Sequence, residues 1–413
     1  MNLASKVTEI ESLLEQHNSF RENCLNLIAS ENIPSPLVER LIVEDLDRRY
    51  GNYSGIELHQ RSYQGNGFIA KIEEYAHHLA QQLFGAAYAD LRPLSGNIAG
   101  IATTFALGSP GDTVLEIDGG HRYAYKLASS ALQVGLRSIP IPWDGVNYNI
   151  DLPQTVALIR EHRPKLLHIG TARFLFPHPI QELKAEMRKS NPESYLIYDA
   201  AHVMGLIAGK RFQSPLQEGA DVLISSTHKT LAGPQGGMIL TNERSIAEKI
   251  AAAITPLLVA NHHLSRLPAL AGTFLEWMAC GAEHADAIIS NAKALGRALD
   301  ERGVPLVGGE LGYTESHTLL PIVDQFGEGK AVADALEACH IITGVSGVPP
   351  ELGTHGLRIG VQEVTRRGMT EADAPEIADC IVDVLRGHDP ADVKRRAIAL
   401  AKRFNRMRFT LEG

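Results

Sequence analysis

The sequence lacks most of the features that direct a chain to a membrane, a metal ion or an oxidising compartment. No apolar run approaches the roughly 20 residues that span a bilayer, and the N-terminus shows neither the basic nor the apolar region of a signal peptide. The four cysteines, Cys24, Cys280, Cys339 and Cys380, lie far apart and without metal-ligand spacing. This favours small buried side chains in a reducing environment over disulfides or a metal site. We therefore expect a cytoplasmic protein without a metal ion.

An excess of positive charge is absent as well. The chain carries 39 Lys and Arg against 48 Asp and Glu, a formal net charge of −9, which offers no broad attraction to nucleic acid or to an anionic membrane. A basic amphipathic helix expected at residues 391–409 should therefore face solvent or a partner subunit. With 413 residues, 44 % of them hydrophobic, the chain should fold into two or three globular domains.

The middle of the chain predicts an α/β architecture. Short apolar runs rich in β-branched residues alternate with helical stretches, as in a mainly parallel sheet covered on both faces by helices. The runs expected as strands are residues 113–117, 166–170, 195–198, 222–226 and 237–241, and helices are expected at 72–85, within 91–106 and at 269–303.

The two ends of the chain predict smaller units. Near the N-terminus, residues 6–18 have the spacing of a helix, which would belong to an arm that packs on a partner subunit. Beyond residue 303, shorter strands are expected at 318–324 and 357–361, with helices at 330–339 and 371–385. We expect an N-terminal arm at 1–30, a large α/β domain at 31–275 and a small C-terminal α+β domain at 276–413.

A lysine follows the end of one expected strand. Residues 222–226 lead into Thr227, His228 and Lys229, and a glycine-rich stretch comes next. Open α/β sheets bind ligands at the carboxyl ends of their strands, and the hydroxyl of Ser226 suits a contact with a phosphate or with the lysine. The alternative is a solvated surface lysine, the usual situation of this residue type.

An aspartate occupies the same position on the preceding strand. Asp199 follows residues 195–198, and His202 lies three residues further on. At a strand end, Asp199 could form a charge pair with a buried cationic group, and His202 could contact a ligand oxygen. The alternative is a carboxylate that caps the next helix.

Two further turns carry candidate ligand-binding groups. Ser95, Gly96 and Asn97 precede an apolar helix, so that their amides would form a helix N-terminus, which attracts phosphate. An ordinary helix cap is the alternative. His121 follows a strand-like run and a Gly-Gly turn and could stack on a ring, although a single histidine is often structural.

Together these residues match what pyridoxal phosphate (PLP) requires of a protein. A lysine must hold the cofactor aldehyde as a Schiff base, and a carboxylate must keep the pyridine nitrogen protonated. A side chain must cover the ring, and amides and hydroxyls must hold the phosphate. Lys229, Asp199, His121 and the Ser95 turn occur in a workable order on one expected sheet, which predicts a PLP enzyme.

The chain also resembles serine hydroxymethyltransferase and its relatives, which are PLP enzymes of fold type I. The resemblance implies a large domain with a mainly parallel central sheet and a smaller C-terminal α+β domain. The motifs that carry it, in family order, are Leu27–Asn32, Ser95-Gly96, Gly119-Gly120-His121, Asp199–Leu206, Thr227–Pro234, Gly356–Gly360 and Thr365–Gly368.

The resemblance implies roles for individual residues. Lys229 would be the Schiff-base lysine, Asp199 the partner of the pyridine nitrogen, and His121 the group that stacks on the ring. Shared sites would make the protein at least a homodimer, with Tyr53 at the neighbouring subunit's phosphate and Tyr63 near the catalytic lysine. The other implied contacts are Ser95, Gly96, Asn97, His202, Ser226 and His228 to the cofactor, and Ser30 and Arg358 to the substrate carboxylate, where a guanidinium fits well.

The chain also departs from the family pattern. Gly55 stands where the family has the glutamate that handles the serine hydroxyl and folate, and Glu57, two residues on, is a candidate replacement. Ala124 replaces the family's second histidine, and Gln235 replaces an arginine. Residues 254–266 replace a glycine-rich segment that contacts phosphate across the dimer. Most losses fall on the side of folate and hydroxymethyl transfer, and losing a general acid or base costs on the order of 10²–10⁴ in rate.

Two function hypotheses follow from this pattern. The leading one is a divergent enzyme like those of lincosamide antibiotic biosynthesis, which act on an S-linked cysteine conjugate by β-elimination or by decarboxylation coupled to oxidative deamination. In it, Gly55 and residues 254–266 would make room for a bulky substrate. The alternative is hydroxymethyl transfer, or an aldolase or transaldolase reaction on β-hydroxy amino acids. A non-catalytic binding protein is disfavoured because Lys229, Asp199 and Arg358 are all retained.

Overall fold

The structure, a computed structural model, describes residues 3–43, 45–129 and 135–412 and divides into two compact units. The larger unit runs over Ser30–Asp286 and takes in the chain end from Phe409. The smaller unit combines the chain up to Ala29 with Ala287–Arg408. The N-terminal residues join the smaller unit because β1 (Leu25–Asn26) pairs with β12 (Ile341–Ile342). The division into an arm and two domains at residues 30 and 275 stays a prediction.

The larger unit is built on a seven-stranded sheet of order β2-β10-β9-β8-β7-β3-β4. Only β10 runs against its neighbours, and the five strands from β9 to β4 are mutually parallel, which confirms the mainly parallel sheet. The strands are β2 (Tyr88–Asp90), β3 (Thr113–Ile117), β4 (Arg137–Ile141), β7 (Leu166–Gly170), β8 (Tyr195–Asp199), β9 (Val222–Ser226) and β10 (Gly237–Thr241), with a separate hairpin of β5 (Trp143–Asp144) and β6 (Asn149–Ile150).

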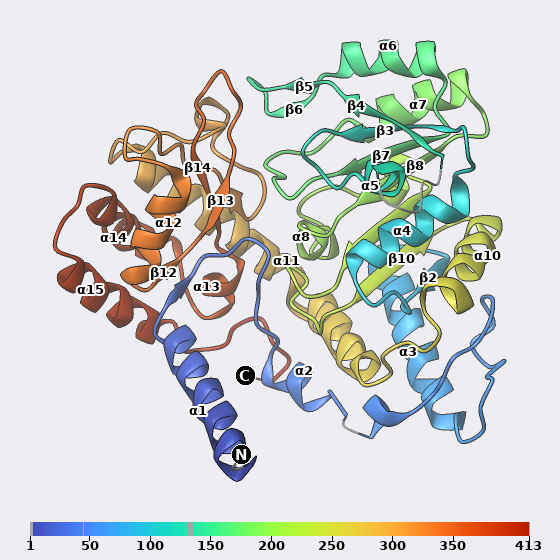
Figure 1. Cartoon of the computed structure of the whole chain (residues 1–413), viewed down its shortest axis with the longest axis horizontal. Coiled ribbons are helices and arrows are strands. Elements are labelled where there is room, and N and C mark those ends of the chain that lie inside the picture. Colours follow the sequence, from blue (N-terminus) through green and yellow to red (C-terminus); the bar gives the residue numbers. More distant parts are fainter. Residues whose placement is uncertain (1–2, 44, 130–134, 413) are drawn as a thin grey trace. The chain divides into compact units, whose positions relative to one another are not determined.

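Helices cover the sheet of the larger unit. Alternate apolar side chains of the strands, such as Val114, Ile197 and Ile224, point into a core that is closed by α4, α5 and α10. In Figure 1, α6 and α7 lie on the other side of β3, β7 and β8 from α4. The helices are α2 (Pro36–Arg40), α3 (Gly67–Phe84), α4 (Gly96–Leu107), α5 (Tyr123–Ser129), α6 (Leu152–His162), α7 (Ile180–Ser190), α8 (Met204–Ala208), α9 (Pro215–Glu218), α10 (Arg244–Ala252) and α11 (Arg266–Asp300), which continues into the smaller unit.

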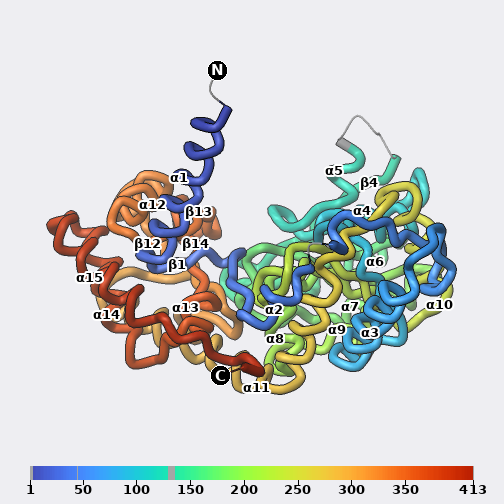
Figure 2. Tube along the Cα trace, turned by 90° about the horizontal axis from the view of Figure 1, so that it is seen from below, coloured from blue at the N-terminus to red at the C-terminus, as the bar shows by residue number. Residues whose placement is uncertain are grey.

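The smaller unit holds a three-stranded antiparallel sheet of order β11-β14-β13 and the parallel pair β1 and β12. Figure 2 shows β1 beside β12 although they come from opposite ends of the chain. The remaining strands are β11 (Thr318–Leu319), β13 (Gly344–Ser346) and β14 (Gly356–Gly360), and the helices are α1 (Leu3–Glu22), α12 (Gly329–Ala338), α13 (Gln362–Arg366), α14 (Ala374–Leu385) and α15 (Pro390–Arg403).

Two expectations for the smaller unit were wrong in extent. The strand expected at 318–324 is only two residues long, because Pro321 has no amide proton for the ladder and forms an isolated bridge with Leu306 instead. The C-terminal helix ends at Arg403 rather than at 409. Phe404 leaves the helical backbone conformation, is buried, and accepts a hydrogen bond from Arg367 Nε.

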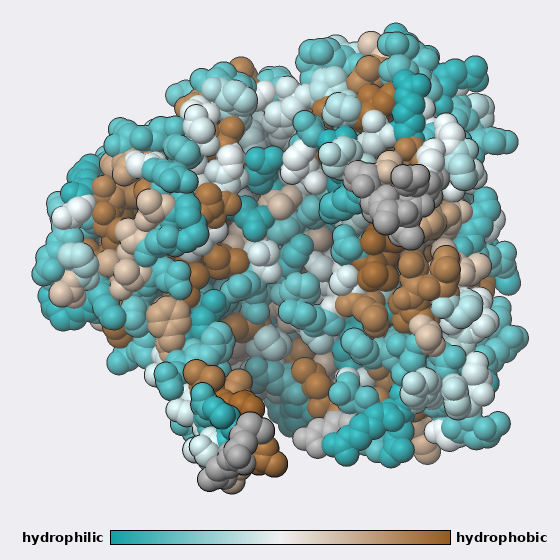
Figure 3. Space-filling model, viewed as in Figure 1, coloured by the Kyte–Doolittle hydropathy of each residue, from teal (hydrophilic) through white to brown (hydrophobic). Residues whose placement is uncertain are grey.

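The first helix exposes an apolar stripe. Leu3, Val7, Ile10 and Leu14, spaced by four, three and four residues, are each 56–67 % exposed, and no residue of α1 is buried. Brown side chains mark this helix in Figure 3. Across the described parts of the chain, none of the helices combines the length and hydrophobicity needed to cross a membrane.

Candidate active site

The candidate site residues of the larger unit gather where its parallel strands end. Asp199 is the last residue of β8, Lys229 follows β9 by three residues, and His121 follows β3 by four. These strands run in the same direction, so their carboxyl ends lie on one edge of the sheet. We call His121, Tyr123, Asp199, His202 and Lys229 the lysine cluster.

Lys229 is partly buried and has polar neighbours. Its Nζ lies 3.1 Å from Nε2 of His202, and its backbone carbonyl accepts a hydrogen bond of 3.0 Å from Asn32 Nδ2. The rings of His202 and His121 have centroids 5.7 Å apart. The structure therefore brings His202 to this amine and His121 to His202, and Lys229 is not a solvated surface lysine.

Asp199 is almost fully buried, with 1 % of its surface exposed. Among the described residues, His121 Nδ1 lies 2.7 Å from Oδ2, the Tyr123 hydroxyl donates to Oδ2 at 2.9 Å, and the amide of Ala201 donates to Oδ1 at 3.0 Å. Burial opposes ionisation, but the charge and hydrogen bond of His121 hold the pKa of Asp199 well below its usual range. A carboxylate can accept about four hydrogen bonds, so these contacts leave one acceptor position, on Oδ1.

The N-terminus of α4 meets the end of β9. Ser95 caps the helix, since its Oγ accepts from the amide of Ile98 at 3.1 Å. A Cβ added to Gly96 would lie 2.9 Å from the amide nitrogen of Ser226, so only glycine permits this approach. Asn97 is exposed in the same turn. Helix N-termini bind phosphate through their amides, and here such a terminus adjoins Ser226 and the strand that leads to Lys229.

The arrangement fits pyridoxal phosphate. It offers an amine, a buried ionised carboxylate with one acceptor position for a pyridinium N–H, and a helix N-terminus for the phosphate. His228 Nδ1 is buried and makes no hydrogen bond to any described residue, which leaves it available to a ligand. His121 contacts Asp199, and its expected stacking on the cofactor ring stays a prediction.

A second group of buried charges in the larger unit surrounds Tyr53. The Tyr53 ring is 1 % exposed and lies between the guanidinium groups of Arg61 and Arg92, 4.8 and 4.4 Å from its centroid. Glu73, which is fully buried, accepts from Arg61 Nη1 at 2.8 Å and lies 2.9 Å from His262 Nε2. Burial alone would raise the pKa of Glu73, but the charge and hydrogen bond of His262 lower it to about 2. We call these five residues the glutamate cluster.

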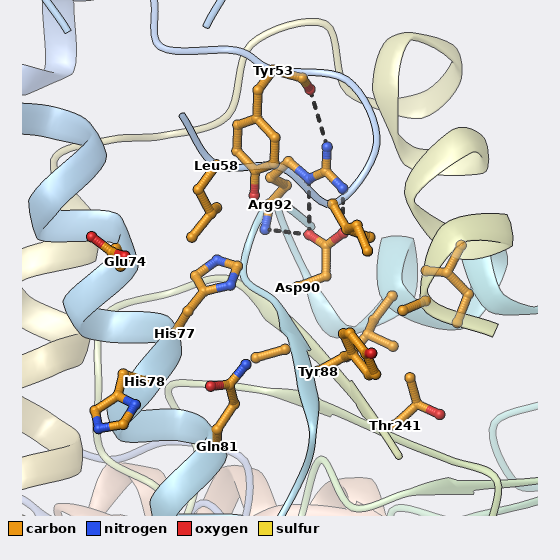
Figure 4. A pocket seen from close by; sticks show the side chains of 15 residues that line it. Tyr53, Leu58, Glu74, His77, His78, Gln81, Tyr88, Asp90, Arg92 and Thr241 are labelled. Atoms are coloured by element: carbon orange, nitrogen blue, oxygen red, sulfur yellow. Dashed lines mark hydrogen bonds and ion pairs between the residues drawn. The ribbon is translucent and has the colours of Figure 1, made fainter. Parts of the chain in front are cut away.

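A cavity of about 290 Å³ borders the glutamate cluster. It lies among α3, β2, β10 and α10, and Figure 4 shows Tyr53, His77, Asp90 and Arg92 around it. Asp90 and Arg92 form a buried ion pair. Other buried atoms on this side of the sheet, among them Arg61 Nη2 and Glu73 Oε1, make no hydrogen bond to a described residue.

Four further predicted residues have these positions within their own units. Tyr63 is half exposed with its ring 5.3 Å from that of Tyr50, and Glu57 is exposed, 3.7 Å from Arg244. Ser30 is half-buried at the start of the larger unit. Arg358 is half-buried on β14 of the smaller unit.

The altered segment at 254–266 is packed into the larger unit. His262 contacts the buried Glu73, and Arg266 Nη2 donates to the carbonyls of Pro93 and Gly237 at 3.2 and 3.0 Å. Both side chains are at least 96 % buried. In this chain the segment therefore fills space and joins elements together.

Sequence reasoning missed several of these residues. Tyr123, Asn32 and the pair Glu73–His262 were given no role. Asn32 stands in a motif that carried the family resemblance, so it offered a signal. Tyr123 is two residues from His121, but its contact with Asp199 crosses 76 residues of sequence, which no local pattern reveals.

Comparison with known proteins gives a consistent result. The family model described as "Serine hydroxymethyltransferase" matches residues 3–381. The serine hydroxymethyltransferase of Pyrobaculum aerophilum is 38 % identical over 415 residues, covering 98 % of this chain and 95 % of the relative. That of Saccharolobus islandicus is 39 % identical over 416 residues, with 98 % and 95 % covered.

A solved structure is similar over nearly the whole chain. The crystal structure of L-threonine transaldolase from Pseudomonas fluorescens in its internal aldimine state superposes with a TM-score of 0.92 at 28 % sequence identity. The match covers 99 % of this chain and 94 % of that one.

Proposed function

The chain belongs to the serine hydroxymethyltransferase family of PLP enzymes, and we propose that it breaks and forms the Cα–Cβ bond of a β-hydroxy-α-amino acid without folate. One observation carries the proposal. The lysine cluster is complete, whereas Gly55 replaces the glutamate that the family uses for the serine hydroxyl and folate. Glu57, the candidate replacement, is exposed and lies 3.7 Å from Arg244, and we infer that it does not take over this role.

The bound cofactor would accept the electron pair released at Cα. Lys229 would hold the cofactor aldehyde, and Asp199 would hold a proton on the ring nitrogen through its remaining acceptor position. Ser226, His228 and the first turn of α4, with Ser95, Gly96 and Asn97, would bind the phosphate. His121 would cover the ring, and His202 would keep its place beside the lysine amine.

Substrate binding would use the remaining predicted residues. Arg358 and Ser30 would bind the amino-acid carboxylate, for which a guanidinium is suited because it forms two parallel hydrogen bonds. A homodimer would bring Tyr53 and Tyr63 of one subunit to the site of the other, and the exposed apolar stripe of α1 supports an association of this kind.

The reaction balances without a further reagent. With L-threonine, the hydroxyl proton leaves, the Cα–Cβ bond breaks to release acetaldehyde, and Cα takes up a proton to give glycine. With a second aldehyde present, Cα instead attacks its carbonyl carbon and a new β-hydroxy amino acid forms. The similarity to a threonine transaldolase supports this reaction.

Serine hydroxymethyl transfer is the second candidate, because the archaeal relatives carry that name at 38–39 % identity. The lincosamide-type reaction on an S-linked cysteine conjugate has less support. None of the relatives named above carries the name of an enzyme of that pathway.

The experiment incubates the PLP-loaded protein with L-threonine, with L-serine and with S-methylcysteine, each with and without tetrahydrofolate. We expect glycine and acetaldehyde from threonine at a rate that folate does not change. Glycine from serine only when folate is present would instead support the second candidate. Release of methanethiol and pyruvate from S-methylcysteine, with threonine inert, would contradict the proposal.

A further inference from the structure

Tyr123 is the one member of the lysine cluster to which the family pattern gives no role. It opens α5, is 3 % exposed, and its hydroxyl donates to Asp199 Oδ2 at 2.9 Å. Burial and the charge of Asp199 raise the pKa of Tyr123 well above its usual value. The hydroxyl therefore remains a proton donor throughout the physiological pH range.

The Tyr123 ring is closely packed between neighbouring residues. A Cβ added to Gly100 on α4 would lie only 2.1 Å from the ring, so the ring occupies the space that any other residue at position 100 would need. On another side, the His168 ring meets the Tyr123 ring edge-on, with centroids 4.9 Å apart at 86°. Both neighbours restrict the ring, and this aims the hydroxyl at the carboxylate.

His168 acts as a neutral packing group. It lies on β7, next to the strand that ends in Asp199, and is 2 % exposed. Neither of its ring nitrogens makes a hydrogen bond to a described residue. Burial lowers the pKa of His168 to about 4, so the imidazole is uncharged at neutral pH. The charge next to Asp199 on this side therefore does not change near pH 7.

A phenylalanine at position 123 would fill the same apolar space, because the Tyr123 ring belongs to the core between α4, α5 and the sheet. Packing accounts for the ring of Tyr123 but not for its hydroxyl group. Together with His121 it occupies both acceptor positions of Oδ2, while Ala201 takes one on Oδ1. This fixes the rotation of the carboxylate and directs the last acceptor position.

We propose that Tyr123 is a positioning residue, which through its hydroxyl orients Asp199 and keeps it ionised, and so strengthens the hold of the chain on a protonated cofactor ring. Without the hydroxyl, one acceptor position of a buried carboxylate stays unfilled. The proton shared with the ring nitrogen then shifts toward Asp199. The inference rests on the cofactor and not on the choice of substrate.

The test compares Tyr123→Phe with Tyr125→Phe, a control on the same helix whose side chain is half exposed over Arg122. The Kd of the apoprotein for PLP should rise about tenfold to a hundredfold in Tyr123→Phe, as for a lost hydrogen bond to a charged group, and should stay unchanged in the control. With nitrogen-15 in the cofactor ring, the NMR shift of bound PLP should move toward the unprotonated form only in Tyr123→Phe. Unchanged Kd and shift would overturn the proposal.

Gly100→Ala supplies a second variant that keeps the hydroxyl but displaces the ring. It should raise the Kd for PLP at least as much as Tyr123→Phe does. The Kd of the double variant should be no higher than that of the weaker-binding single variant, because both changes remove the same hydrogen bond to Asp199. Alanine favours helix more than glycine, so helix weakening does not explain such a loss. Additive effects would overturn the proposal. If the wild-type protein itself fails to bind PLP, the assigned cofactor is wrong. If the wild type binds PLP and Tyr123→Phe binds it equally well, only the role of Tyr123 is wrong, so the two failures can be told apart.

Discussion

The lysine cluster and the glutamate cluster are built from similar side chains, but their carboxylates have different surroundings. Both bury a carboxylate near histidine in the larger unit. Asp199 in the lysine cluster ends the strand next to the one that leads to Lys229, whereas Glu73 in the glutamate cluster is bound by Arg61 and approached by two histidines. The difference teaches that burial and a lowered pKa do not by themselves mark a reactive carboxylate. Glu73 Oε1 also lacks a hydrogen bond to any described residue, so what distinguishes Asp199 is the lysine that follows the neighbouring strand.

The largest effect should come from the amine. Lys229→Ala removes the group that holds the cofactor and should lower turnover by on the order of 10⁴ or more, as the loss of a covalent group does. Borohydride reduction followed by peptide mapping should label Lys229 in the wild type and nothing in the variant. Lys249→Ala, an exposed lysine of α10, is the control and should keep full activity. Ordinary turnover by Lys229→Ala would remove the basis of the comparison.

The glutamate cluster should respond in stability and not in chemistry. Glu73→Gln leaves Arg61 and His262 buried without their anion and should lower the free energy of unfolding by about 3 kcal/mol. Urea denaturation measures this, and the Kd for PLP of the folded protein should change less than twofold. The control is Glu74→Gln, whose side chain is 57 % exposed and which should change stability by less than about 0.5 kcal/mol. A large loss of PLP affinity in Glu73→Gln would mean that the two clusters are coupled.

The stability of Glu73→Gln should also differ from that of the wild type in its dependence on pH. The pKa of Glu73 lies at about 2 in the folded chain, below its usual value. A lowered carboxyl pKa contributes stability that is complete above the unfolded value and disappears as pH falls toward the folded one. Between about pH 5 and pH 2 the wild type should lose this contribution, while Glu73→Gln has none to lose. Parallel acid-unfolding curves for the two proteins would contradict the assignment.

The smallest effect should come from Glu57→Gln. An exposed ion pair such as Glu57–Arg244 contributes roughly 0–1 kcal/mol, and turnover of threonine should change less than twofold. This variant tests whether Glu57 has taken over from the glutamate missing at position 55. A loss of 10²–10⁴ in rate would show a general acid or base, and would place part of the chemistry beside the glutamate cluster.

The sequence was sufficient for five of the seven strands of the large sheet, all but β2 and β4, and for one side of the site. The apolar runs at 113–117, 166–170 and 222–226 became β3, β7 and β9 with the same bounds, because strands buried on both faces leave a continuous apolar signal. The polar residues after such strands meet at one sheet edge, so Asp199 and Lys229 could be placed together before any coordinates.

Contacts that cross the chain could not be predicted in this way. The pair Glu73–His262 joins α3 to a loop far along the sequence, and neither residue has a pattern that names its partner. Tyr53 lies between Arg61 and Arg92 within one chain, and its role at the phosphate of another subunit stays a prediction. Packing of this kind depends on the whole fold and not on local spacing.

The interlock between Gly100 and Tyr123 constrains how this site could have arisen. Any ancestor with a side chain at position 100 had no space for the aromatic ring at 123. Glycine at position 100 must therefore have been present before the ring, or both residues arose together. Relatives that keep a larger residue at the first position should carry a small one at the second, and this pairing can be read from their sequences alone.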